Sequence, residues 1–295
     1  MDEQPLRPDT PFALDKQRFR AQFDRAADTY DTAAVLQREV ADRMIERLDV
    51  VKREPARILD VGCGTGYCTR LLARRYRRAR ITGVDIAWRM TAHARRAAGW
   101  FGQKHFVCGD SERLPFANGA FDMVTSNLML QWCDPLTVFG EFVRVLEPGG
   151  LLMFTTFGPD TLLELKQAWR SADNAGHVHG FIDMHDLGDA LVRAGFAEPV
   201  MDAERYTLTY GDVYGVMRDL KAIGASNAQP SRPRGLTGRA RFKRFQAAYE
   251  TMAKDGRIPA TYEVAYGHAW APTAACPRRD GSTVAIPLDQ IRRRR

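Results

Sequence analysis

The stretch Asp60-Val61-Gly62-Cys63-Gly64-Thr65-Gly66 decides the fold of this chain. It follows the apolar run Arg57-Ile58-Leu59 and precedes Tyr67-Cys68-Thr69-Arg70-Leu71-Leu72, a pattern that predicts a strand, a tight turn and a helix. Glycines at alternate positions let the backbone turn sharply and approach a ligand that a Cβ would block. The helix that follows presents unpaired N–H groups toward a polar or anionic ligand group.

The glycine spacing, G-x-G-x-G, differs from the G-x-G-x-x-G of dinucleotide-binding turns. It favours S-adenosylmethionine, whose carboxylate needs close backbone approach but which has no pyrophosphate to be held. The first candidate cofactor-binding residues are therefore Asp60, Gly62, Gly64 and Gly66.

A second predicted strand, 80–85, ends in the carboxylate of Asp85. In βαβ nucleotide-binding folds, an acidic residue about 20 positions beyond the turn accepts hydrogen bonds from ribose hydroxyls. Asp85, with Ile86 after it, is therefore the candidate partner of a ribose.

A third predicted strand, 105–108, leads to a polar turn that contains Asp110, Ser111 and Glu112. Asp110 is the candidate acceptor for an adenine amino group, and Ser111 is a further candidate cofactor-binding residue. Glu112 is expected to face solvent.

A fourth predicted strand, 121–126, ends at Asn127, and Glu147-Pro148-Gly149-Gly150 precedes a fifth at 151–154. This order of motifs resembles that of class I S-adenosylmethionine-dependent methyltransferases. The resemblance implies an α/β, Rossmann-like, doubly wound sheet of seven strands, with Asn127 at the cofactor site.

The composition is that of an ordinary globular protein, with 45% hydrophobic and 27% charged residues. No apolar run approaches the roughly 18 residues that span a bilayer, and the first residues lack a secretory pattern. We expect a cytoplasmic protein with no membrane partner. The five cysteines have no C-x-x-C spacing, so neither a metal site nor a disulfide framework is expected.

The net charge of +7 comes largely from arginine runs at 74–78 and 292–295. A basic surface attracts nucleic acid, but no aromatic-rich RNA-binding motif accompanies it, and an acidic carrier protein is an equally good electrostatic match. We expect no nucleic-acid partner. The first run should end the helix that follows the glycine turn, since cations complement the carbonyl end of a helix.

The pattern of elements divides the chain into five parts. Hydrophobic residues repeat at helical spacing between 16 and 50, strands and helices alternate in the middle of the chain, and a helical segment separates the last two predicted strands, 204–210 and 261–270. The expected parts are an N-terminal helical lid (1–54), a Rossmann-like core (55–210), a helical cap insertion (211–257), the final core strand (258–272) and a disordered basic tail (273–295).

Segments outside the glycine turn resemble one family within this class, the malonyl-[acyl-carrier protein] O-methyltransferases of biotin synthesis. They are Arg18-Phe19 through Tyr30-Asp31, Ser126 through Trp132, Leu163 through Trp169, and Leu220 through Asn227. The resemblance implies methylation of the free carboxyl group of a malonyl thioester, carried by acyl-carrier protein or coenzyme A. A basic or phenolic group must hold that carboxylate, and Arg25, Tyr30 and Lys221 are the candidates.

Two alternatives remain open from the sequence. Gly158-Pro159-Asp160-Thr161-Leu162 and Ile258-Pro259-Ala260-Thr261-Tyr262 resemble a mitochondrial complex I assembly factor that hydroxylates a protein arginine, although no mitochondrial presequence is visible. A small-molecule or nucleic-acid methyltransferase is the second alternative. Enzymes that methylate exocyclic amines often carry N-P-P-[YF] after strand four, where this chain has Ser126-Asn127-Leu128-Met129.

Three polar side chains and two neighbours of the fourth strand have ambiguous roles. His177, His179 and Asp183 have the spacing of metal ligands, but histidines in a polar loop are usually exposed, so no metal is expected. Gln131 and Trp132 either line a ligand pocket or belong to the core.

Overall fold

The computed structural model describes residues 14–99, 103–173, 175–230, 232, 235, 237–273, 279–280 and 283–284. The helices are α1 (Lys16–Ala26), α2 (Tyr30–Ala33), α3 (Val35–Glu46), α4 (Tyr67–Arg75), α5 (Trp88–Ala97), α6 (Pro135–Val145), α7 (Leu163–Arg170), α8 (Met184–Ala194), α9 (Val213–Ala222) and α10 (Arg239–Glu250), with 3₁₀ turns η1 (Arg47–Val50) and η2 (Leu130–Trp132). The strands are β1 (Arg57–Val61), β2 (Arg80–Asp85), β3 (Lys104–Cys108), β4 (Phe121–Asn127), β5 (Leu146–Phe157), β6 (Ala197–Tyr210), β7 (Ile258–Trp270), β8 (Arg279–Asp280) and β9 (Thr283–Val284).

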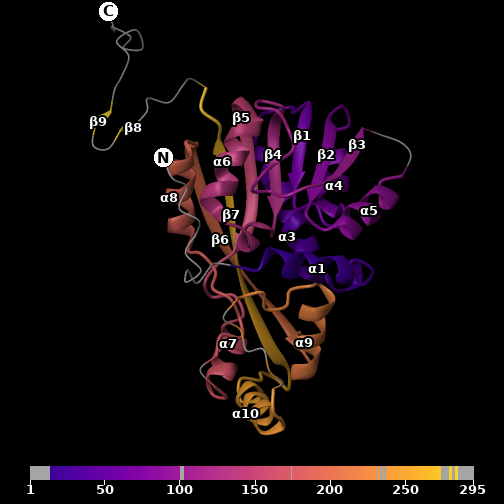
Figure 1. Cartoon of the computed structure of the whole chain (residues 1–295), viewed down its shortest axis with the longest axis vertical. Helices are drawn as coiled ribbons and strands as arrows, with labels where there is room; N and C mark the ends of the chain where they lie inside the picture. Colours follow the sequence, from indigo (N-terminus) through magenta and orange to yellow (C-terminus); the bar gives the residue numbers. More distant parts are fainter. Residues whose placement is uncertain are drawn as a thin grey trace, which may run out of the picture.

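Seven strands form one sheet in the order β3-β2-β1-β4-β5-β7-β6 (Figure 1). The first five run parallel, and β7 pairs antiparallel with both β5 and β6. The predicted doubly wound, seven-stranded fold is confirmed, including the antiparallel pair of final strands at one edge. The strands are longer than expected, since β5 and β6 begin several residues before the predicted 151 and 204.

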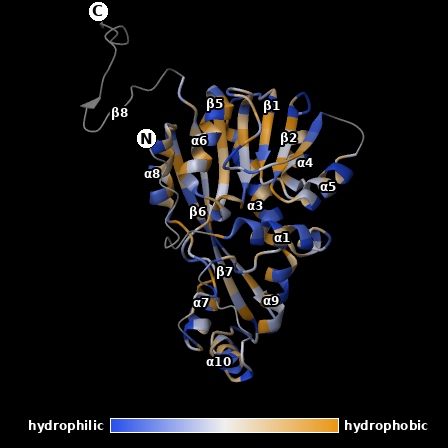
Figure 2. Ribbon diagram, viewed as in Figure 1, coloured by the Kyte–Doolittle hydropathy of each residue, from blue (hydrophilic) through white to orange (hydrophobic). Residues whose placement is uncertain are grey.

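One face of the sheet is covered by α6 and α8. Asp134 caps α6 by accepting a hydrogen bond from the Thr137 N–H, and Pro135 occupies the first turn, where its missing N–H costs nothing. The helix buries Val138, Phe139, Phe142 and Val145 against the strands. Burying a side chain of this size stabilises the fold by about 1.5–3 kcal/mol. The strands at the centre of the sheet are correspondingly hydrophobic (Figure 2).

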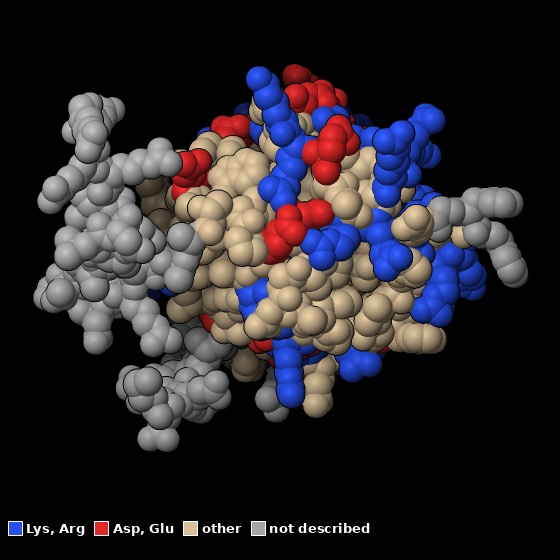
Figure 3. Space-filling model, turned by 90° about the horizontal axis from the view of Figure 1, so that it is seen from above, with Lys and Arg blue, Asp and Glu red and all other residues tan. Residues whose placement is uncertain are grey.

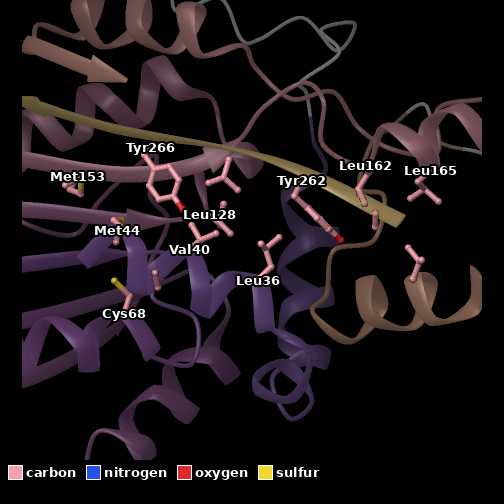
Figure 4. Close-up of a cluster of buried hydrophobic side chains, with 14 of the residues drawn as sticks. Leu36, Val40, Met44, Cys68, Leu128, Met153, Leu162, Leu165, Tyr262 and Tyr266 are labelled. Atoms are coloured by element: carbon pink, nitrogen blue, oxygen red, sulfur yellow. The ribbon is translucent and has the colours of Figure 1, made fainter. Parts of the chain in front are cut away.

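The other face is covered by α3 and α4. Leu36, Val40 and Met44 of α3 point toward Cys68, Leu128 and Met153, and the same buried cluster continues along β7 to Leu162 and Leu165 (Figure 4). Arg74 and Arg75 lie in the last turn of α4, as the sequence predicted. One continuous apolar cluster therefore runs from α3 and α4 on the sheet to α7, α9 and α10 at the far ends of β6 and β7.

The cap contains more of the chain than its expected bounds, 211–257. β6 and β7 extend beyond the other strands, and α7, α9 and α10 gather around their far ends (Figure 1). The ring of Trp169 in α7 stacks on that of Phe245 in α10 with centroids 4.0 Å apart. The sequence placed α7 within the core (55–210), and in the structure the stacked indole holds this helix against α10.

The segment after 272, expected to be disordered, lies almost entirely outside the described residues. Five of its residues are described, and four of them pair as the short antiparallel strands β8 and β9. Among the residues that the structure describes, no helix combines the length and the apolar character needed to cross a bilayer.

Candidate cofactor and substrate sites

The glycine turn between β1 and α4 has the backbone conformation that the sequence predicted. Gly62, Gly64 and Gly66 have φ values of +73°, +52° and +82°, a region that side chains with a Cβ rarely adopt. Space matters as well, because a Cβ on Gly62 would lie 2.5 Å from the Cγ of Met129. The turn therefore excludes side chains both by conformation and by contact.

Asp85, at the end of β2, is tied to this turn. One of its oxygens accepts a hydrogen bond from the Gly64 N–H at 2.9 Å, and the other accepts from the Ala87 N–H at 2.8 Å. Burial raises the pKa of Asp85 to about 6, although both backbone hydrogen bonds lower it. The carboxylate lines a cavity and keeps lone pairs that can accept further hydrogen bonds there.

Asp60 differs from its expected role. Its side chain is 1% exposed and accepts hydrogen bonds from the hydroxyls of Thr69 at 2.5 Å and Thr125 at 3.4 Å. It does not line the cavity. Burial raises its pKa to about 6. Through these two threonines, Asp60 connects the turn to α4 and β4, on the side of the turn away from the cavity.

The cavity lies between the carboxyl ends of the strands and the helices α1 and α2, with a volume of about 650 Å³ that is partly open to solvent. Eight of the predicted site residues line it: Tyr30, Gly62, Gly64, Asp85, Ile86, Asp110, Ser111 and Asn127. Gly66 does not. It is the N-cap of α4, where an added Cβ would lie 3.0 Å from the Cβ of Ala94 in α5.

The polar turn after β3 is held by a lysine that the sequence did not single out. Lys16 of α1 forms ion pairs with Asp110 at 2.7 Å and with Glu112 at 2.5 Å. Glu112 also accepts the Asp134 N–H, so the expectation of a solvent-facing carboxylate was wrong. These contacts fix the lid helix against the turn and leave Asp110 at the cavity wall.

Tyr30, at the start of α2, packs against Ala27, Ala87 and Met90, and its ring lies 4.0 Å from where a Cβ on Gly64 would be. Burial raises the pKa of its hydroxyl, and the nearby carboxylates of Asp85 and Asp31 raise it further. The phenol is therefore neutral at physiological pH and can only share its proton in a hydrogen bond.

Aromatic side chains from α1 close one wall of the cavity. The ring centroids of Phe19 and Phe23 lie 5.6 Å and 5.1 Å from that of Trp132, which belongs to η2. The question left open for Trp132 now has an answer: it is buried, and it lines both this cavity and a second one. Gln131 lines only the second.

The second cavity is a larger groove between the core and the cap, with a volume of about 1,580 Å³, much of it open to solvent. Its walls come from α1, α7, α9 and the segment around His179. Three cations line it, Arg18, Lys221 and Arg232, and no Asp or Glu is found among its described lining residues. The groove therefore favours an anionic ligand.

The structure separates the three candidates for binding a carboxylate. Tyr30 lines the first cavity and Lys221 the second, whereas Arg25 is exposed and lines neither. Arg18, two helical turns earlier on α1, lines the groove in its place and is anchored by its Nε, which donates to the Asn227 carbonyl at 3.2 Å. The spacing of seven residues gives both arginines the same helical face. This sequence spacing could not show which turn of α1 lies beside the groove.

The three possible metal ligands do not come together. His177 pairs with Asp173 at 2.8 Å, and Asp183 caps α8 and pairs with His185. Within the described residues, no group of three or more ligating side chains is placed to hold a metal ion.

His179 is different because it is buried without a partner. Its side chain is 9% exposed, its Nε2 has no hydrogen bond within the described part of the chain, and it lines the groove. Burial lowers its pKa to about 4, with a smaller contribution from Lys166. A neutral imidazole nitrogen is thus available to a ligand.

Comparison with known proteins agrees with this architecture. Residues 59–154 match a family described as a methyltransferase domain. The YcgJ protein from Bacillus subtilis superposes with a TM-score of 0.57 at 16% identity, covering 80% of this chain and 99% of that one. A putative methyltransferase from Bacillus halodurans superposes with a TM-score of 0.57 at 17% identity, covering 79% and 99%. The fold and the matched domain define a class I methyltransferase.

The sequence relatives identify the family. Malonyl-[acyl-carrier protein] O-methyltransferases from Laribacter hongkongensis and Methylovorus are 58% and 54% identical to this chain over 277 residues, covering 91% and 92% of it and 93% and 94% of their own lengths. The chain belongs to the malonyl-[acyl-carrier protein] O-methyltransferase family. The resemblance found in the sequence is confirmed, and the hydroxylase alternative is not favoured.

Proposed function

We propose that this protein transfers the methyl group of S-adenosylmethionine to the free carboxylate of a malonyl thioester carried by acyl-carrier protein. The product is the malonyl methyl ester, an early intermediate of pimeloyl and biotin synthesis. The observation that carries the proposal is the pair of cavities that share Trp132, one formed around the glycine turn and one lined by cations.

The first cavity fits the methyl donor. Gly62 and Gly64 allow close backbone approach, Asp85 has acceptor capacity for the ribose hydroxyls, and Asp110 and Ser111 lie where they can contact the adenine. Ile86 and Asn127 complete the same wall. Asp60 and Gly66 act indirectly, by holding the turn and starting α4.

The groove fits the malonyl thioester. Arg18 and Lys221 are candidates for holding the carboxylate, and Tyr30 can donate a hydrogen bond from the cofactor side. A guanidinium is suited to this role because its paired N–H groups match the two oxygens of a carboxylate, and each oxygen keeps a further lone pair that can react. Arg25 is not retained, because it is exposed outside both cavities.

The donor, when bound, supplies a positively charged sulfonium whose methyl group is open to attack. A carboxylate is already a nucleophile at neutral pH, so no general base is needed. One carboxylate oxygen would form the new C–O bond as the C–S bond of the bound donor breaks, and the electron pair of that bond would remain on sulfur. Because opposite charges neutralise each other, the dry wall formed by Phe19, Phe23 and Trp132 favours the reaction over the solvated reactants.

The test is direct methyl transfer. Purified protein is incubated with S-adenosylmethionine and malonyl-carrier protein, and the carrier is examined by mass spectrometry. A gain of one methyl group is expected, whereas acetyl-carrier, which has no free carboxylate, should gain none. Malonyl-coenzyme A in a parallel reaction compares the two carriers. A malonyl-carrier that stays unmethylated while the cofactor binds would overturn the proposal.

A matched pair of arginines tests the carboxylate contact. Arg18→Gln should lower kcat/KM for malonyl-carrier about tenfold or more, since a hydrogen bond to a charged group contributes about 1.5–3 kcal/mol. Arg25→Gln removes the same charge two turns away on the same helix and should change kcat/KM less than about twofold. Both variants should bind S-adenosylhomocysteine with the affinity of the parent protein.

A further inference from the structure

The cap concentrates positive charge. Residues 211–257 contain ten Lys and Arg against four Asp and Glu, in a chain whose net charge is only +7. Part of this charge faces the groove through Lys221 and Arg232. The other described cations of the cap do not line the groove.

The start of α10 carries this charge at a cost to the helix. Four cations, Arg239, Arg241, Lys243 and Arg244, fall within its first six residues. The first turn has no acidic residue, and Gly238 provides no side-chain cap. Cations at the amino end of a helix oppose its dipole, and like charges four residues apart repel each other. Local stability does not explain this arrangement.

Two of these cations have neither an ion pair nor a hydrogen bond with any described residue. Arg241 pairs with Asp173, and Arg244 donates to the Ala172 carbonyl. Arg239 and Lys243 are exposed, and no carboxylate in the described part of the chain pairs with either. They are four residues apart and therefore share one face of α10.

The segment that leads into α10 reaches the groove. Thr237, two residues before α10, lines the groove, as does Lys221 of α9. Beside them, Tyr214 of α9 is 50% exposed and contacts Phe242 of α10 with ring centroids 5.5 Å apart. An exposed aromatic ring among unpaired cations is a composition that suits a protein interface.

We propose that Tyr214, Lys221, Arg239 and Lys243, here called the cap surface, dock an acidic carrier protein so that its thioester arm enters the groove. The inference rests on the proposed function. It adds the surface that binds the carrier protein itself, separate from the groove that binds the acyl group. The cations supply attraction and orientation, and the tyrosine supplies an apolar anchor.

The test compares a protein-bound substrate with a carrier-free one. The double variant Arg239→Glu and Lys243→Glu is assayed with malonyl-carrier protein and with malonyl-pantetheine, which enters the groove but presents no protein surface. We expect kcat/KM for malonyl-carrier to fall at least tenfold and kcat/KM for malonyl-pantetheine to change less than twofold. The milder Arg239→Gln and Lys243→Gln double variant should show a smaller loss in the same direction.

A matched control lies at the opposite end of the sheet. Arg77 and Arg78 are exposed just before β2, where no carboxylate in the described residues pairs with either. Figure 3 views the molecule from that end and shows Lys and Arg side chains gathered on one side of it. Arg77→Glu with Arg78→Glu makes the same change in net charge and should leave both activities intact.

The outcomes separate the two proposals. If the parent protein methylates neither malonyl substrate, the proposed function itself fails. If the parent is active and the cap double variant is unchanged toward malonyl-carrier, or loses both substrates equally, the docking surface is overturned. The same holds if carrier turnover persists in that variant while binding of a short single-stranded RNA is lost, since the surface would then serve nucleic acid.

Discussion

Two carboxylates next to the glycine turn, Asp60 fully buried and Asp85 partly buried, differ in their contacts despite nearly equal pKa values. Burial raises the pKa of both Asp60 and Asp85 to about 6. The Asp60 carboxylate accepts hydrogen bonds from two threonine hydroxyls, whereas the Asp85 carboxylate lines the cavity. The sequence could identify both as acids flanking the turn, but it could not show which one the folded backbone exposes to a ligand.

The first prediction concerns protonation of Asp85. Ribose hydroxyls donate to the ionised carboxylate, so binding of S-adenosylhomocysteine should weaken as pH falls through about 6. Between pH 7.5 and pH 5 the dissociation constant should rise about tenfold, because about one molecule in eleven remains ionised one unit below the pKa. Calorimetry across this range measures it.

Asn variants provide the control for this titration. Asp85→Asn should bind S-adenosylhomocysteine more weakly by about 1–3 kcal/mol at pH 7.5, and its affinity should depend little on pH. Asp60→Asn should retain the pH dependence because Asp85 is still present. A titration that persists in Asp85→Asn and disappears in Asp60→Asn would reverse the two roles.

The second prediction concerns His179, whose buried Nε2 has no hydrogen-bond partner among the described residues. If this nitrogen contacts the thioester arm, His179→Phe should raise KM for malonyl-carrier several-fold, since a neutral hydrogen bond contributes about 0.5–1.5 kcal/mol. The same change should keep or raise the melting temperature, because it removes an unsatisfied polar group from an apolar site.

Thermal unfolding and steady-state kinetics on the same His179→Phe sample test whether KM rises while the melting temperature stays the same or rises. Affinity for S-adenosylhomocysteine should not change. With a pKa of about 4, the imidazole stays neutral, so its loss should leave the pH profile between 6 and 8 unaltered. A lower melting temperature with an unchanged KM would make His179 a purely structural residue.

Among the structural elements, the glycine turn was predictable because its conformation depends on its own residues. Positive φ values at Gly62, Gly64 and Gly66 follow from the absence of a Cβ. The position of α7 was not predictable, because it depends on a stack between Trp169 and Phe245, which are far apart in the sequence. The contact of Arg18 with the groove was not predictable either, because hydrophobic periodicity shows which face of a helix is buried and not which of its turns lies beside a groove.

The third prediction separates conformation from contact within the turn. Gly62→Ala should cost about 1–2 kcal/mol for the left-handed backbone, with a further loss from the collision with Met129. Gly195→Ala, at the end of α8, has a φ of +97° and no atom within 4 Å of the added Cβ, so it carries the backbone cost alone.

Denaturant unfolding and binding of S-adenosylhomocysteine should distinguish these two glycine variants. Gly62→Ala should be the less stable and should bind poorly, because relief of the collision moves the cavity wall. Gly195→Ala should bind normally. Equal losses of stability with normal binding in both would mean that the contact with Met129 has no consequence.

For the whole molecule, the sheet order followed from the alternation of strands and helices, because parallel strands need crossover helices and those connections have one hand. The relation between the two cavities did not follow from it. Trp132 links them through contacts with Phe19 of α1 and with His179, which lies between α7 and α8. These residues are far apart in the sequence, so no local pattern could predict that they meet.

The last prediction follows from the distribution of charge over the molecule. If the cap steers an acidic carrier, kcat/KM for malonyl-carrier should fall as salt rises from about 0.05 to 0.5 M, since the Debye length is about 8 Å at 0.15 M and shrinks further above it. Malonyl-pantetheine, whose only charge is bound inside the groove, should show a much weaker dependence.

The variants locate the source of this salt dependence. Arg239→Glu with Lys243→Glu should flatten the slope for malonyl-carrier, whereas Arg77→Glu with Arg78→Glu should leave it unchanged although the net charge is altered equally. A slope that follows net charge in both variants would indicate a general attraction to a basic protein. A slope that responds only to the cap variant requires that the carrier meets α10 on its way to the groove, because screened charges act only over distances comparable with the Debye length.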